Sequence, residues 1–209
     1  MSEEGESAGV PALPAEVARL VLEWRGPFSW PGFEESAGLP TIPREPGVYL
    51  QTFSCGTGFA IYGAGITKRD AATRFREHTR KYLNGEYNVL SVPAGERGIR
   101  DVIWRGWGYA RAHRDEFETR RNEIQDAARS QMSAFKLFLA DPDVLCPGVR
   151  LRERLEVAVM NCLYAQPSPL CDLPDTGMFL ARRRMAEAPV IVENVSRSQL
   201  HGLPRYLEL

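Results

Sequence analysis

The sequence predicts an α+β fold in which a small three-stranded antiparallel sheet is flanked by helices. Two short apolar segments joined by a Gly-containing turn predict a hairpin, and a third aromatic segment follows farther along the chain. Stretches with apolar residues at helical spacing follow both the hairpin and the third segment. N- and C-terminal extensions complete the expected architecture.

The predicted hairpin is rich in β-branched and aromatic residues. Gly47 to Phe53 reads GVYLQTF and Phe59 to Tyr62 reads FAIY, with the turn SCGTG at Ser54 to Gly58 between them. Gly63 to Ile66 is expected to end the second strand. Asp101 to Tyr109 (DVIWRGWGY) is expected to form the third strand.

Four helices are predicted from apolar spacing and capping. The first spans Ala15 to Trp24, and the second runs from Thr67 to about Leu83, because Thr67 and Asp70 resemble a capping box. His113 to Ala140 contains no Pro or Gly and predicts one long amphipathic helix. Leu151 to Tyr164 predicts another helix.

These patterns divide the 209 residues into four segments. Residues 1–14 are small and acidic and are expected to be disordered. Residues 15–46 form a helix and a Pro-rich lead-in, residues 47–167 form the central domain, and residues 168–209 form a C-terminal extension with a short strand at Val190 to Val192.

The bulk composition is that of an ordinary globular protein. The net charge is −1, so any nucleic-acid surface must be a local basic patch. The four cysteines form no CxxC pair, which argues against structural zinc. The acidic start is unlike a signal peptide, and no apolar run is long enough to span a membrane. We therefore expect a reduced, cytoplasmic protein with no membrane partner, whose oligomeric state the sequence leaves open.

Two tyrosines and an Arg–His pair are candidate site residues. Side chains alternate along a strand, so the hairpin can set Tyr49 and Tyr62 on one face. Arg74 and His78 are four residues apart on the following helix and share a face. The guanidinium fork of arginine matches phosphate oxygens. The alternative interpretation is a pair of half-buried packing tyrosines beside a solvated helix face.

The order of these residues resembles the GIY-YIG endonuclease family. Gly47-Val48-Tyr49 is followed by Ile61-Tyr62-Gly63 and then by Arg74-x-x-x-His78. Glu156 lies in an apolar stretch that precedes Pro167, where the family carries a metal-binding Glu. The resemblance covers about residues 43–167. It implies a small antiparallel sheet packed by helices, and metal-dependent hydrolysis of phosphodiester bonds in nucleic acid, with DNA as the expected substrate.

The resemblance also implies a role for each site residue. Glu156 would hold one divalent cation, Mg²⁺, and Arg74 would bind the phosphate. Tyr49 would help to activate the attacking water, and Tyr62 would position the water or the phosphate. His78 would tune Tyr49 or relay a proton.

Three departures from the family pattern leave alternatives open. The second motif reads Ile-Tyr-Gly, so either Tyr62 is the match with a displaced turn or a bulge corrects the register. Glu153 lies one helical turn before Glu156 and competes for the metal. Ser168-Pro169-Leu170 stands where the family often has an Asn, for which Asn161 and Asn194 are candidates.

Two groups of basic residues are candidate phosphate contacts, with a solvated charged face as the alternative. They are Arg76, Arg80 and Lys81 on the predicted helix, and the run Arg182, Arg183 and Arg184. Trp104 and Trp107 are expected to face opposite sides of the third strand. We expect both to pack in the core and not to stack on bases.

Two further functions stay open at this level. One is a catalytically inactive nucleic-acid-binding module with the same fold, which the shifted Tyr and the missing Asn motivate. The other is a protein-interaction domain in which the tyrosines only pack, which the near-neutral charge motivates.

Overall fold

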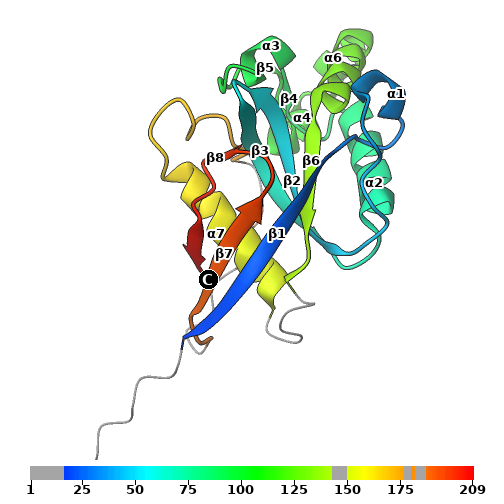
Figure 1. The fold of residues 1–209 in the computed structure, drawn as a ribbon. Coiled ribbons are helices and arrows are strands. Elements are labelled where there is room, and N and C mark those ends of the chain that lie inside the picture. Colours follow the sequence, from blue (N-terminus) through cyan, green and yellow to red (C-terminus); the bar gives the residue numbers. More distant parts are fainter. Residues whose placement is uncertain (1–16, 143–149, 177–179, 182–186) are drawn as a thin grey trace, which may run out of the picture.

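The computed structural model describes residues 17–142, 150–176, 180–181 and 187–209. A seven-stranded mixed sheet has the order β8-β3-β2-β6-β1-β7-β9, and β4 and β5 form a separate two-stranded sheet (Figure 1). The strands are β1 Ala18–Phe28, β2 Gly47–Cys55, β3 Gly58–Thr67, β4 Val89–Leu90, β5 Val102–Trp104, β6 Lys136–Ala140, β7 Val190–Ser196, β8 Leu200–His201 and β9 Tyr206–Glu208. The helices are α1 Glu34–Ala37, α2 Ala71–Leu83, α3 Val92–Gly95, α4 Trp107–Ala112, α5 Arg114–Thr119, α6 Arg121–Ala134 and α7 Leu151–Tyr164.

The expected three-stranded sheet with terminal extensions is wrong. The large sheet takes β1 from the segment before the hairpin and β7, β8 and β9 from the C-terminal segment. It is mixed, because β1 pairs antiparallel with β6 but parallel with β7. Strands from both ends of the sequence are therefore integral to the sheet. The expected disorder of residues 1–14 lies outside the described residues.

The helix expected at Ala15 to Trp24 is also wrong, because its described part lies in β1. Leu22 and Trp24 are buried, while Val21 before them is 60% exposed and Glu23 between them is exposed. This period of two belongs to a strand. The seven residues Ala18 to Trp24 pair in parallel with β7, a strand about 170 residues away in sequence. Pairing with β7 decides the conformation of this segment, and the apolar spacing that suggested a helix does not.

The long helix expected from His113 to Ala140 ends early. α5 and α6 occupy residues 114–134, but Lys136–Ala140 forms β6, between β1 and β2 in the sheet. Leu137, Phe138 and Leu139 are all fully buried, on alternating faces. A strand buried on both faces is a continuous apolar run, and such a run also satisfies helical spacing.

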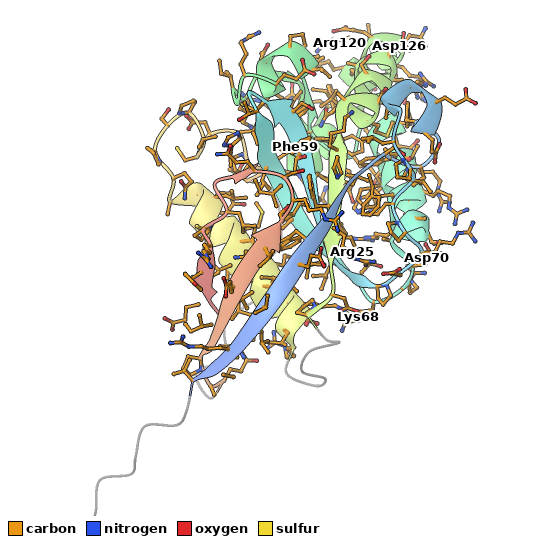
Figure 2. The ribbon with its side chains drawn as sticks, in the orientation of Figure 1. Arg25, Phe59, Lys68, Asp70, Arg120 and Asp126 are labelled. Atoms are coloured by element: carbon orange, nitrogen blue, oxygen red, sulfur yellow. The ribbon has the colours of Figure 1, made fainter. Side chains whose placement is uncertain are left out.

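Other boundaries need smaller corrections. The third strand is short, since β5 ends at Trp104, pairs with β4, and is followed by α4. Gly63 to Ile66 does not end the second strand, because β3 continues to Thr67. Asp70, and not Thr67, caps α2, since its carboxylate accepts a hydrogen bond from the Thr73 N–H at 2.7 Å (Asp70 is labelled in Figure 2).

The hairpin, the second helix and the fourth helix are confirmed. β2 and β3 pair antiparallel, α2 ends at Leu83 as predicted, and α7 spans the predicted residues Leu151–Tyr164. The short strand predicted at Val190 to Val192 is the start of β7.

The sheet is covered on both faces (Figure 1). One core joins the sheet to α2 and α6, and includes Phe53, Phe75 and Met132. The other joins the sheet to α7, and includes Leu50 and Leu155. Because α7 and α2 lie on opposite faces, their side chains can meet only around an edge of the sheet.

That edge is the second half of β3. β8 pairs with β3 only at Phe59 and Ala60. Beyond these residues, from Gly63 to Ile66, β3 lines a cavity. None of the helices in the described parts of the chain has the length and hydropathy that crossing a bilayer requires.

Candidate functional site

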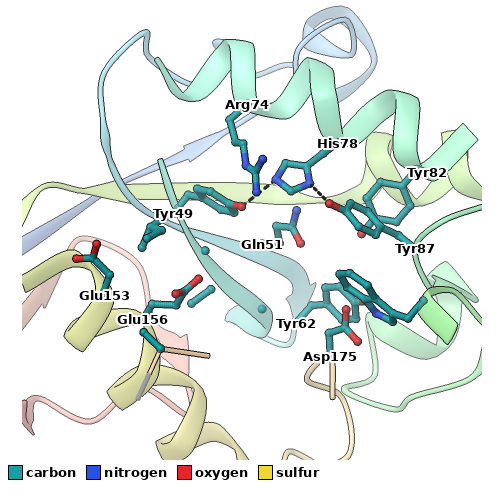
Figure 3. A pocket seen from close by; sticks show the side chains of 16 residues that line it. Tyr49, Gln51, Tyr62, Arg74, His78, Tyr82, Tyr87, Glu153, Glu156 and Asp175 are labelled. Atoms are coloured by element: carbon teal, nitrogen blue, oxygen red, sulfur yellow. Dashed lines mark hydrogen bonds between the residues drawn. The ribbon is translucent and has the colours of Figure 1, made fainter. Parts of the chain in front are cut away.

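A cavity of about 380 Å³ at the edge of β3 collects all five candidate catalytic residues. Tyr49, Tyr62, Arg74, His78 and Glu156 all line it. Figure 3 shows Arg74 and His78 projecting from α2 toward Tyr49, with Glu156 approaching from α7 on the other side of β3. Residues more than 100 positions apart in sequence therefore face one common space.

Small residues at the end of β3 let the two sides meet. Gly63, Ala64 and Gly65 line the cavity between the phenols and α7. α7 lies close to this strand, where the sulfur of Met160 is 3.2 Å from the backbone N of Ala64. Larger side chains here would fill the space between Tyr49 and Glu156.

A bulge in β3 sets the position of Tyr62. Gln51 pairs with Gly63 and Thr52 pairs with Ile61, so Tyr62 is an extra residue between two consecutive pairs. Ile61 packs in the core on the α7 side, whereas Tyr62 packs in the core on the α2 side. Of the two alternatives left by the sequence, the structure has the bulge, and Tyr62 shares its face with Tyr49.

Tyr49 packs directly across its strand partner Gly65. Tyr49 and Gly65 are opposite one another in the antiparallel pair, and a Cβ on Gly65 would lie 2.7 Å from Cε2 of Tyr49 and closer still to the hydroxyl end of the ring. Real Cβ atoms do not approach so closely, so only Gly lets the ring lie flat over the strand. Gly65 thereby fixes where the hydroxyl of Tyr49 points.

His78 connects two phenols. Its Nε2 lies 2.9 Å from the hydroxyl of Tyr49, and its Nδ1 lies 3.1 Å from the hydroxyl of Tyr87 (Figure 3). A neutral imidazole has one N–H donor and one acceptor nitrogen. One phenol therefore donates to His78 and the other accepts from it, which makes a continuous chain of hydrogen bonds from Tyr49 to Tyr87.

Burial keeps the Tyr49–His78–Tyr87 chain of hydrogen bonds uncharged. Removal from water, together with the positive charges of Arg74 and Lys81, lowers the pKa of His78 to about 3. Burial also raises the pKa of the Tyr49 phenol above its ordinary value, although the Arg74 guanidinium beside it favours the phenolate. At neutral pH a proton can move along neutral partners, but neither group is charged at rest.

Arg74 is held at the mouth of the cavity. Nη1 of Arg74 contacts a carboxylate oxygen of Glu77 at 3.3 Å, and its side chain is 36% exposed. Its Nε is buried and has no hydrogen-bond partner among the described residues. A buried donor of this kind is costly unless a ligand supplies the acceptor.

Glu156 and Glu153 are both on the α7 side of the cavity, but only one is paired. Glu153 forms an ion pair with Lys68 at 3.2 Å. Glu156 is only 8% exposed and has no ion pair within 4.0 Å among the described residues. Arg152, four residues earlier, binds Asp141 instead. The carboxylate available to a cation is therefore that of Glu156.

The electrostatics of Glu156 fit a cation site with few protein ligands. Its pKa is raised to about 7, mainly by burial and also by the Glu153 carboxylate, while Arg74 opposes the rise. A buried carboxylate without a partner requires a proton or a cation. No group of three or more His, Cys, Asp or Glu side chains in the described parts of the chain could hold a metal. Mg²⁺ accepts one or two carboxylates plus waters and phosphate oxygens, so the single carboxylate of Glu156 suits it.

Several other residues that line the cavity were not identified from the sequence. They are Gln51, Tyr82, Tyr87, Trp107 and Asp175. Tyr87 follows α2 and belongs to no motif. Asp175 binds the edge of β3, since its backbone N–H donates to the carbonyl of Tyr62 at 2.8 Å. The Tyr62 hydroxyl is buried without a hydrogen-bond partner among the described residues.

The remaining sequence candidates are more dispersed. Arg76 and Arg80 are exposed on α2 but do not line the cavity. Arg182, Arg183 and Arg184 lie outside the described residues. Neither Asn candidate lines the cavity. Asn161 is exposed, and Asn194 accepts a hydrogen bond from Nε1 of Trp24 at 3.0 Å.

Comparisons of the chain with protein-family models, with curated proteins and with solved structures find no match. The resemblance to the GIY-YIG family therefore depends on the residues named above and on the geometry of the cavity.

Proposed function

We propose that this protein is a metal-dependent endonuclease that hydrolyses phosphodiester bonds in nucleic acid, with DNA as the substrate. The observation that carries the proposal is the convergence of Tyr49, Tyr62, Arg74, His78 and Glu156 on one cavity at the edge of β3. The five residues come from β2, β3, α2 and α7. Packing alone does not explain why the buried Glu156, which has no ion pair among the described residues, shares this cavity with Arg74, whose Nε–H has no acceptor there.

The charged groups define where the substrate phosphate binds. Arg74 would donate its free Nε–H and a terminal N–H to two phosphate oxygens. The Glu156 carboxylate would hold one Mg²⁺, which when bound supplies charge neutralisation at the phosphate and at the leaving oxygen. The phosphate would thus lie between α2 and α7, over Gly63 and Gly65.

Proton transfer would use the Tyr49–His78–Tyr87 chain. As a water oxygen attacks phosphorus, its proton passes to the Tyr49 oxygen while the Tyr49 proton passes to Nε2 of His78. This route uses the tautomer in which Nδ1–H of His78 would donate to Tyr87, 3.1 Å away, and Nε2 would be the acceptor. The bound phosphate offsets the charge of Arg74, one cause of the lowered His78 pKa, so binding makes His78 a better base. The P–O bond to the leaving group breaks, and that oxygen takes a proton from solvent.

A plasmid-nicking assay tests the proposal. Supercoiled DNA is incubated with wild type, Glu156→Gln or Glu153→Gln in the presence of Mg²⁺ or Mn²⁺. The metal concentration is on the order of 5 mM, because a site with few protein ligands is expected to bind Mg²⁺ weakly. We expect nicking by wild type, loss of at least about 100-fold in Glu156→Gln, and a smaller loss in the matched Glu153→Gln control.

The other outcomes separate the competing functions. DNA binding without nicking in any metal rejects hydrolysis and favours an inactive binding module. No affinity for DNA or RNA even at low salt favours a protein-interaction domain.

The described cysteines Cys55, Cys162 and Cys171 are free thiols, which supports a reducing, cytoplasmic location for the proposed reaction.

A further inference from the structure

A second, smaller cavity adjoins the candidate site. It has a volume of about 190 Å³ and shares the side chains of Tyr87 and Trp107 with the larger cavity. Its other lining residues are Lys81, Glu86, Ala110, Arg111 and Arg114. A ligand that extends from the scissile phosphate into this cavity must pass over the two shared aromatic rings.

Trp107 packs against the core expected from the sequence, but at its edge. Trp104 is buried, 1% exposed, as expected, but Trp107 is the first residue of α4 and is only half-buried. Its φ of 54° lies in the left-handed region, which is unfavourable for a large side chain. Its Nε1 is buried and has no hydrogen-bond partner among the described residues.

The surrounding backbone holds Trp107 in this conformation. The backbone N–H of Trp107 donates to the carbonyl of Glu86 at 2.7 Å. Any Cβ on Gly106 would collide with the backbone of Tyr87, so the backbones at Gly106 and Tyr87 are in direct contact. The ring centroids of Trp107 and Tyr87 are 4.9 Å apart. The indole is therefore a fixed aromatic surface at the junction of the two cavities.

The second cavity is rich in positive charge. Three of its lining residues are cationic and one, Glu86, is acidic. Lys81 lies over the ring of Tyr87 at 5.5 Å, and neither it nor the exposed Arg111 has an ion pair within 4.0 Å in the described parts of the chain. Arg114 is paired with Glu118 at 3.5 Å, on the surface where such pairs contribute little.

From this arrangement we infer that an unpaired nucleobase next to the scissile phosphate stacks on Trp107, while the following phosphates bind Lys81 and Arg111. Aromatic platforms beside a basic groove bind single strands, because every nucleotide presents the π face of its base and a backbone phosphate. A base within a duplex is already stacked on its neighbours and is not free to stack on the indole. The inference depends on the proposed function for its substrate, and it predicts a preference for single-stranded or locally unpaired nucleic acid.

Tryptophan fluorescence gives a direct test. Of the four tryptophans, Trp24, Trp30 and Trp104 are at most 1% exposed, so a ligand at this site quenches Trp107. The probes are a single-stranded thymidylate oligonucleotide, an abasic strand with the same phosphates, and a duplex of equal length. All titrations contain chelator and no metal. We expect quenching by the thymidylate strand and little by the abasic strand or the duplex.

Two substitutions of Trp107 separate the contribution of stacking to affinity from the fluorescence signal that reports it. Trp107→Leu should weaken binding of the thymidylate strand by about 5- to 150-fold and leave the abasic strand unchanged. Trp107→Phe should lose the quenching signal but retain most of the affinity, measured by anisotropy of a labelled strand. Circular dichroism and the fluorescence of the three buried tryptophans check that each variant is folded.

A charge series tests the phosphate contacts. The double variant Lys81→Gln/Arg111→Gln should reduce the slope of log K against log salt by about 1.4 for a single strand. The matched control is Arg129→Gln on α6, which is exposed and does not line either cavity.

The inference is overturned if Trp107→Leu binds the thymidylate strand as wild type does, or if the abasic strand binds equally well. It is also overturned if no strand binds at low salt. Because these titrations exclude metal, they are independent of nicking. Nicking without any effect of Trp107 rejects only the present inference, and stacking without nicking rejects only the hydrolysis.

Discussion

The hydroxyl of Tyr49 lies 2.9 Å from Nε2 of His78, and both side chains are buried. This contact joins the hairpin to α2 and lets a proton leave Tyr49 without forming an isolated phenolate. It also explains how a tyrosine with a raised pKa can serve in hydrolysis.

Tyr49→Phe removes the hydroxyl and keeps the ring. We expect nicking to fall by about 10²- to 10⁴-fold, because the proton of the attacking water loses its acceptor. Tyr87→Phe is the matched control, since it removes the other hydrogen bond to His78 without touching the water. It should cost less, on the order of 10-fold. Single-turnover nicking rates measure both, and equal effects of the two variants would contradict the direction of transfer.

Gly65→Ala should displace Tyr49 without changing any charged group. The added Cβ would overlap the phenol ring, so the ring must move. We expect a loss of about 1–3 kcal/mol in the free energy of unfolding, together with reduced nicking. Gly108→Ala in α4 is the control, because nothing lies within 4 Å of its Cβ. There nicking should be unchanged and the free energy of unfolding should not fall, because Gly to Ala within a helix is neutral or stabilising by up to about 1 kcal/mol. Similar losses in the two variants would contradict the packing explanation.

Glu156→Gln should stabilise the metal-free protein above neutral pH. The folded-state pKa is raised from 4.5 to about 7, so the folded protein holds a proton that the unfolded chain has released between these values. Stability therefore falls as pH rises through this window, and the penalty, about 3 kcal/mol, is complete above pH 7. Glutamine carries no charge and avoids the penalty.

Urea unfolding of wild type and Glu156→Gln at two pH values measures this difference. The variant should be more stable at pH 8, and the difference should disappear at about pH 3.5, well below the unfolded-state pKa of 4.5, where the carboxyl is protonated in both states. Added Mg²⁺ should stabilise the wild type at pH 8 and not the variant. A pH-independent difference would show that Glu156 is not desolvated.

Leu139→Ala tests the placement of β6 between β1 and β2. Leu139 is fully buried and pairs with both Arg25 and Tyr49. Truncation should lower the free energy of unfolding by about 2–5 kcal/mol. Val21→Ala in β1, where the side chain is 60% exposed, should change it by less than about 0.5 kcal/mol. If residues 136–140 were the exposed end of a helix, Leu139→Ala would be as mild as Val21→Ala.

Much of the candidate site could be predicted from local sequence patterns. Alternation along β2 and β3 placed Tyr49 and Tyr62 on one face, and the four-residue spacing of Arg74 and His78 placed both on the cavity side of α2. The limits of α7 were also predictable. These are properties of neighbouring residues, whose period of 2 or 3.6 is visible in the sequence itself.

The remaining features depend on contacts between distant segments. Residues 18–24 and 136–140 are strands because β7, β1 and β2 pair with them, although their apolar spacing also fits a helix. Glu156 meets Tyr49 only because α7 and α2 approach the free edge of β3 from opposite faces of the sheet. Tyr87, in the loop after α2, and Trp107, at the start of α4, enter the site through packing that no periodicity describes. The sequence by itself determined which side chains share a face of each element, and the tertiary structure decided which faces meet, because long-range pairing free energy exceeds local preference.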